Sequence, residues 1–124
     1  MSKDRNSNSR YDLEERTKEF ALKMQRIYKK LPGSVQNIED GKQLIRSSGS
    51  QAANYIEANE ALSKKDFAYR IKICRKEAKE TTLWLELCNT GDSTKLNEMR
   101  DELLNEVVEL RKIFSSILSK SLEN

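Results

Sequence analysis

The chain has 124 residues, of which 36% are hydrophobic and 35% charged, and its formal net charge is +3. This length fits one domain, and a single proline with four glycines leaves long uninterrupted segments that favour helices. The absence of histidine excludes the Glu-x-x-His pairs of di-iron bundles, Ser-His and Cys-His nucleophile pairs, and histidine zinc sites. We therefore expect a protein that is not an enzyme and has no cofactor and no metal site.

The first ten residues, MSKDRNSNSR, are polar, so we expect a disordered tail at 1–10 and one domain at 11–122. No apolar run has the length of a signal peptide or a membrane span, which predicts a protein without membrane contact. Cys74 and Cys88 stand fourteen residues apart in one helical segment, too far for a disulfide within it. They indicate reduced core thiols and a cytoplasmic location.

The first predicted helix begins at Asp12, where a capping aspartate is followed three residues later by Glu15. Pro32 and Gly33 end this helix. Its apolar stripe consists of Leu13, Thr17, Phe20, Met24, Ile27, Tyr28 and Leu31.

The second helix is expected to start between Ser34 and Ile38 and to end near Leu62. Its segment Gly41–Ala58 keeps helical spacing although it is rich in residues that form helices poorly. Tertiary packing must therefore hold this helix. The face predicted to be buried closely against another helix carries Ile38, Gly41, Ile45, Ser48, Ala52 and Ile56.

Ser63, followed by Asp66, is the predicted cap of the third helix, which ends at Asn89–Gly91 with Gly91 as a left-handed terminator. Its stripe is Phe67, Ile71, Cys74, Ala78, Thr81, Leu85 and Cys88. The fourth helix is predicted from Asp92 or Ser93 to Leu118, with the stripe Leu96, Met99, Leu103, Val107, Leu110, Phe114 and Ile117. Short connections between long helices predict an all-α, antiparallel up-down-up-down four-helix bundle.

Positive charge is segregated on the third helix, away from its apolar stripe. The candidate nucleic-acid-binding residues there are Lys65, Lys72, Arg75, Lys76 and Lys79. A second basic row in the first helix, Lys23, Arg26 and Lys30, is expected to extend this surface. Segregated charge concentrates positive potential and favours a polyanion such as RNA or DNA, whereas the alternative is an ordinary solvated helix face.

A second apolar patch on the third helix lies away from the core stripe and carries Tyr69, Ile73, Trp84 and Leu87. An exposed patch with a tryptophan favours an oligomer interface. In the alternative, Trp84 packs on a neighbouring helix of the same chain.

Two carboxylate pairs have a spacing that could place two oxygens on one metal: Glu57 with Glu60, and Glu77 with Glu80. We expect these groups to pair with Arg46, Lys76 or other bases between helices, or to face solvent. The chain has neither a Cys-x-x-Cys zinc motif nor a glycine-rich phosphate loop.

The run Gly41–Ser47, continued by Ser50, Ala53–Tyr55 and Glu57–Ala58, resembles the signature of the 23S rRNA intervening-sequence, or S23, protein family. Further matches are Asp12–Glu14, Leu31–Pro32, Ser63–Lys64 with Phe67, Lys76–Ala78, Glu80–Thr81 and Trp84–Leu87. The resemblance spans about residues 12–118. Gly49 and Gln51 depart from it, where a threonine and an apolar β-branched residue are expected.

The resemblance implies a bacterial homopentamer of antiparallel four-helix bundles. It also implies a relation to the accessory proteins of diversity-generating retroelements, which are basic pentamers that engage nucleic acid and a reverse transcriptase. Our first hypothesis is a cytoplasmic homo-oligomer that binds RNA or DNA without sequence-specific readout, and a reverse transcriptase is a partner if the gene belongs to a retroelement. The alternative is a structural or adaptor oligomer that binds a protein partner.

Overall fold

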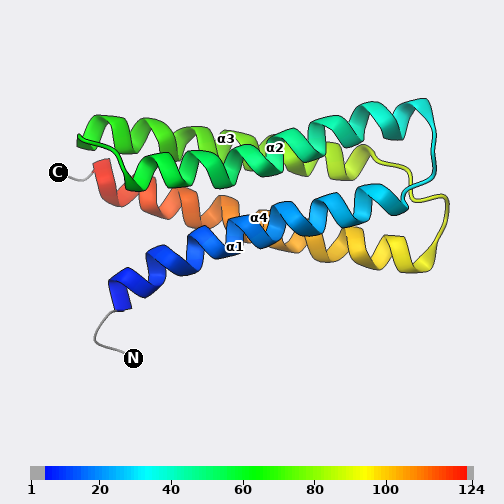
Figure 1. Ribbon diagram of the computed structural model, residues 1–124, viewed down its shortest axis with the longest axis horizontal. Helices are drawn as coiled ribbons and strands as arrows, with labels where there is room; N and C mark the ends of the chain where they lie inside the picture. Colours follow the sequence, from blue (N-terminus) through cyan, green and yellow to red (C-terminus); the bar gives the residue numbers. More distant parts are fainter. Residues whose placement is uncertain (1–4, 123–124) are drawn as a thin grey trace.

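The computed structural model describes residues 5–122, with side chains from Asp12 onward. Its four helices are α1 (Arg5–Lys30), α2 (Val35–Asn59), α3 (Lys64–Leu87) and α4 (Thr94–Leu122), and these residues form no strand. The helices run alternately in opposite directions, as Figure 1 shows. Each packs on its neighbours in chain order and α4 closes on α1, whereas α1 and α3 lie diagonally opposite without packing together. The predicted antiparallel four-helix bundle is confirmed.

The helix ends follow local sequence signals at α2 and α3. The Ser34 and Ser63 side chains accept hydrogen bonds from the third backbone N–H of their turns, at 3.1 Å from Asn37 and 3.0 Å from Asp66. The predicted cap at Ser63 is confirmed. Gly91 has the expected left-handed conformation, with φ of 65°, although α3 already ends at Leu87.

The predicted start of the first helix at Asp12 is wrong, because α1 already begins at Arg5. No proline or glycine interrupts the chain between these two residues, so the helix continues toward the N-terminus. Residues 5–10 of the predicted tail thus form the first turns of α1, and residues 1–4 lie outside the described chain.

Three of the four predicted apolar stripes form the core. Their members are buried or pack against the buried cluster, including the two free cysteines Cys74 and Cys88. The largest fully buried side chains are Phe20, Phe114, Met24, Ile27, Leu44, Ile71, Leu85 and Leu110. The periodicity in α1, α3 and α4 therefore predicts their buried faces correctly.

The predicted buried face of α2 is wrong for most of its length. Ile38 and Ile56 are 44% and 49% exposed, and Ile45 and Ala52 are only partly buried. The buried face is Asn37, Asp40, Gly41, Leu44, Ser47, Ser48, Gln51, Tyr55 and Ala58. Polar side chains are buried here because several find hydrogen-bond partners inside the bundle, so hydrophobic periodicity alone misplaces the face.

At Gly41, α2 lies so close to Tyr28 of α1 that there is no room for a side chain. A Cβ atom built on Gly41 would lie 1.9 Å from Cε1 of Tyr28, which is far inside van der Waals contact. The predicted role of a small residue in close helix packing is therefore confirmed at Gly41.

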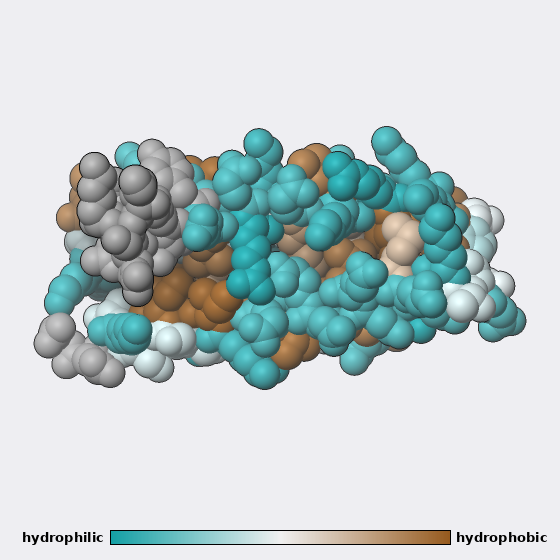
Figure 2. Space-filling view, turned by 90° about the horizontal axis from the view of Figure 1, so that it is seen from below, coloured by the Kyte–Doolittle hydropathy of each residue, from teal (hydrophilic) through white to brown (hydrophobic). Residues whose placement is uncertain are grey.

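The bundle is least tightly closed between α1 and α4. An open groove of about 760 Å³ lies there, lined by residues 15–26 of α1 and 99–109 of α4. Figure 2 shows the face of the bundle that carries these two helices, with hydrophobic residues visible between hydrophilic ones. We call this feature the α1–α4 groove.

Candidate nucleic-acid interface

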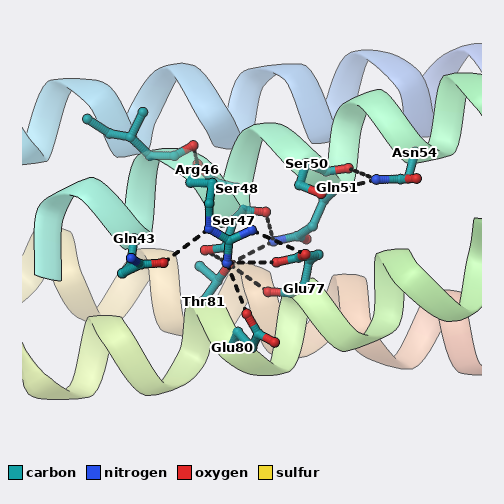
Figure 3. A network of polar contacts seen from close by, with 11 residues as sticks. Gln43, Arg46, Ser47, Ser48, Ser50, Gln51, Asn54, Glu77, Glu80 and Thr81 are labelled. Carbon is teal, nitrogen blue, oxygen red and sulfur yellow. Dashed lines mark hydrogen bonds and ion pairs between the residues drawn. The ribbon is translucent and has the colours of Figure 1, made fainter.

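A polar layer joins α2 to α3 in the middle of the bundle, as Figure 3 shows. The Thr81 hydroxyl donates to the Glu77 carbonyl oxygen at 2.8 Å and accepts from Gln51 Nε2 at 3.0 Å. Because its one proton is used, the buried Ser47 hydroxyl must donate to Thr81 Oγ1, 2.7 Å away. These contacts fix the rotation and register of α3 against α2.

Arg46 of α2 lies at the edge of this layer and binds two carboxylates of α3. Its Nη1 donates to Glu77 Oε2 at 3.3 Å, and its Nη2 donates to Glu80 Oε1 at 3.0 Å. The hydrogen bond to Glu77 is the main cause that raises the pKa of Arg46. The expected pairing of Glu77 and Glu80 with Arg46 is thus confirmed, whereas Glu57 and Glu60 face solvent.

The α2-facing flank of α3 therefore holds these two acidic groups around one cation, Arg46, which balances one of their two negative charges. The predicted cations lie elsewhere on the helix, about 100 to 180° around its axis from Glu77 and Thr81, although Lys76 is only about 40° and one turn from Glu80. This other flank, which we call the basic flank, consists of Lys65, Lys72, Arg75, Lys76 and Lys79. It borders α4 and solvent.

The basic flank is open to a ligand. Its four lysines are exposed and Arg75 is partly buried. None of the five forms an ion pair with any residue of the described chain. Positive charge here is consequently not neutralised by the protein itself, which is what a phosphate-binding surface requires.

One cation of α4 on the side of α3 was not among the predicted residues. Arg100 points to the α3 side of α4, because its Nη1 donates to the Cys88 carbonyl oxygen at 3.4 Å. Arg111 lies eleven residues further along, or about three turns, and so projects from the same side of α4. A helical wheel of the fourth helix would have found it. Arg111 therefore lies on the side of α4 that faces α3.

The second basic row does not join this surface. Lys23, Arg26 and Lys30 are exposed on α1, which lies diagonally opposite α3. Lys23 and Arg26 line the α1–α4 groove together with five glutamates. The structure thus places the two basic rows on different sides of the bundle, with α4 between them.

The apolar patch of α3 is divided between exposed and packed residues. Tyr69 and Leu87 are 59% and 45% exposed, and Ile73 is partly buried. Trp84 is also partly buried, and it packs against the core of its own chain, as the alternative interpretation has it. Tyr69 and Leu87 remain available to a partner.

No group of three or more Cys, Asp or Glu side chains in the described chain is placed to hold a metal ion. None of the described helices is both long and apolar enough to span a membrane.

The fold and this surface define an antiparallel four-helix-bundle protein with one uncompensated basic flank. The profile of the 23S rRNA-intervening sequence protein family matches residues 10–116, and the chain belongs to this family. It is also similar to a crystal structure of a protein of unknown function from the S23 ribosomal protein family of Bacteroides thetaiotaomicron. The two share 33% identity with a TM-score of 0.72, over 86% of this chain and 97% of that one. No curated protein matches.

Proposed function

We propose that this protein is a non-enzymatic homo-oligomer that binds RNA or DNA through the basic flank of α3. The observation that carries the proposal is the separation of charge on this helix. Glu77 and Glu80 are bound by Arg46 on one flank, whereas the cations of the other flank have no ion-pair partner in the described chain. The helix therefore presents net positive charge on its outer side.

The geometry favours contact with phosphates over readout of bases. Lys72, Lys76 and Lys79 follow one another at steps of four and three residues, or about 6 and 4.5 Å along the axis. Adjacent phosphates of one strand of a duplex are about 3.4 Å apart along its axis, so flexible lysines can follow one strand. Exposed lysines supply charge without fixed direction, and such contacts position a nucleic acid but do not specify its sequence.

Assembly would strengthen this binding. The family resemblance implies a pentamer, in which five basic flanks act together although each chain carries only +3. Linked weak sites gain affinity through effective concentration. We assign two of the exposed apolar residues of α3, Tyr69 and Leu87, to the contact between copies.

The test is the salt dependence of binding, measured by fluorescence anisotropy with a labelled single-stranded RNA and a labelled DNA duplex. Log affinity should fall steeply with log salt, by about 0.9 for each DNA phosphate contact. The triple variant Lys72→Gln, Arg75→Gln, Lys76→Gln should lower this slope by roughly 2 to 3 on DNA.

The matched control is Lys23→Gln, Arg26→Gln, Lys30→Gln, which removes the same charge from α1. It should change the slope by less, because these residues lie away from the basic flank and two of them adjoin glutamates. Equal effects of the two triple variants would mean that only net charge matters. Salt-insensitive binding, or none at about 50 mM salt, would refute the proposal.

A further inference from the structure

We infer that the α1–α4 groove is a docking site for a basic amphipathic helix of another protein. The groove lies outside the basic flank and has the opposite charge. Three properties of the groove support a basic amphipathic helix as its ligand: its shape, its apolar floor and the negative charge of its rims.

The shape of the groove suits one additional helix. It runs along residues 15–26 of α1 and 99–109 of α4, which is about 15 Å or three helical turns on each side. The two helices are antiparallel and pack less closely than the other neighbouring pairs. A third helix laid along the solvent side of both would complete a common recognition mode, in which an amphipathic helix enters an apolar groove.

The floor of the groove is apolar. Phe20 of α1 and Leu103 of α4 lie buried beneath it, with 1% and 5% exposed, and Met99 is the partly exposed apolar side chain of the lining. Methionine adapts its shape to a partner more readily than branched side chains do. Leucine or isoleucine side chains spaced three and four residues apart would cover this floor.

The rims of the groove are acidic. Arg16 and Glu106 bridge α1 to α4 through two hydrogen bonds of 2.6 and 2.8 Å, so this pair neutralises itself. Four other glutamates line the groove without an ion pair in the described chain, against two cations, Lys23 and Arg26. Four negative and two positive charges leave the groove at −2, in a chain whose total is +3.

This charge selects the occupant. A nucleic acid would be repelled by the four glutamates, Glu15, Glu19, Glu102 and Glu109. If a second copy inserted its basic flank, it would occupy the lysines that the proposed function assigns to phosphates. A partner helix with leucines on one side and lysines or arginines beside them matches both the floor and the rims.

The experiment uses the full chain and two labelled synthetic probes of about 14 residues, or four turns. One probe is an amphipathic helix of leucine and lysine, and the other has glutamate at every lysine position. Fluorescence anisotropy should show that the wild-type protein binds the lysine probe and not the glutamate probe. The variant Glu102→Lys, Glu109→Lys should bind the lysine probe at least about tenfold more weakly and gain affinity for the glutamate probe.

The matched control is Glu39→Lys, Glu57→Lys, which reverses two exposed charges on α2 outside the groove. This variant should keep the wild-type preference, and circular dichroism should show that both variants remain helical. Equal loss of binding in control and groove variants would overturn the inference. So would a fall in assembled mass caused by the groove variant alone, because a second copy would then occupy the groove.

The variant Lys72→Gln, Arg75→Gln, Lys76→Gln separates this inference from the proposed function. It should lose nucleic-acid affinity and still bind the lysine probe with wild-type affinity, because its substitutions lie on α3. Failure of nucleic-acid binding would therefore leave the groove result intact, and the reverse also holds.

Discussion

Arg46 of α2 and Glu77 of α3 form an ion pair in which the carboxylate is buried and the guanidinium is half exposed. Arg46 Nη1 lies 3.3 Å from Glu77 Oε2, and Arg46 Nη2 lies 3.2 Å from Oε1. Glu77 is only 6% exposed, so its charge depends on this partner. The pair both holds α2 to α3 and leaves the opposite flank of α3 positive.

Replacement of Arg46 by alanine should therefore destabilise the fold. It leaves the Glu77 carboxylate buried without its cation and removes the contact to Glu80 as well. We expect a loss of about 2 kcal/mol in the free energy of unfolding, below the range for fully buried pairs because Arg46 is half exposed. Urea unfolding measures this change.

The control is Lys42→Ala, which removes an exposed pair with Glu39 on the same helix. We expect it to change the free energy of unfolding by less than about 0.5 kcal/mol. If Arg46→Ala were as mild as Lys42→Ala, the ion pair would not stabilise the α2–α3 contact.

The two glycines of α2 should respond in opposite directions to the same substitution. Gly41→Ala places a Cβ that overlaps the Cδ1–Cε1 edge of the Tyr28 ring and should destabilise the fold by about 1 to 3 kcal/mol. Gly49 has nothing within 4 Å of a built Cβ, so Gly49→Ala should stabilise the helix by about 0.5 to 1 kcal/mol. Thermal unfolding of the two variants measures the difference. Similar effects at both positions would contradict the close approach at Gly41.

The comparison of sequence with structure separates two kinds of information. Apolar periodicity in the first, third and fourth helices is enough to predict their buried faces. The hydrophobic effect drives leucine, isoleucine and phenylalanine into the core without any specific partner. The buried face of α2 could not be predicted in this way. Ser47 and Gln51 are buried because Thr81, on another helix, supplies their hydrogen bonds.

The candidate site shows the same division. A helical wheel places the lysines of α3 on one flank, since that depends on one helix only. It cannot show that α1 lies diagonally opposite α3, or that Lys23 and Arg26 adjoin the glutamates of α4. Contacts between helices decide these relations, and the sequence of one helix does not contain them.

The corrected face of α2 predicts a large difference between two aliphatic residues. Leu44 is fully buried, whereas Ile56 is 49% exposed. We expect Leu44→Ala to cost about 2 to 5 kcal/mol of stability and Ile56→Ala less than about 1 kcal/mol. Urea denaturation with both variants tests this difference. A greater loss of stability for Ile56→Ala than for Leu44→Ala would indicate that α2 buries the face that apolar periodicity predicts.

Burial should make the core thiols unreactive in the folded protein. Desolvation raises the pKa of Cys74 to about 12 and also raises the pKa of Cys88. Because the thiolate is the reactive form, a disulfide reagent at pH 8 should modify these thiols only on unfolding. The time course of labelling, with and without urea, measures this protection.

The same shift gives a pH dependence with a definite sign. Between about pH 9 and 12 the Cys74 thiol ionises in the unfolded chain but stays protonated in the folded one. The unfolded state is favoured as it loses this proton, so the stability present below pH 9 decreases as pH rises through this window. Cys74→Ala should reduce this decrease in stability.

For the labelling experiment, rapid modification of the folded protein at pH 8 would contradict the burial of both thiols.

The exposed part of the apolar patch predicts the effect of charge on assembly. Tyr69→Asp and Leu87→Asp place a carboxylate on surface that we assign to the contact between copies, and such a charge is costly when desolvated there. Each should lower the assembled mass in light scattering while the helical signal in circular dichroism is retained.

Trp84 is a poorer probe because it packs on its own core, so its truncation would also lower stability. The control is Leu62→Asp, at a fully exposed position between α2 and α3, which should leave the mass unchanged. A wild-type protein that is monomeric at micromolar concentration would refute the assigned contact.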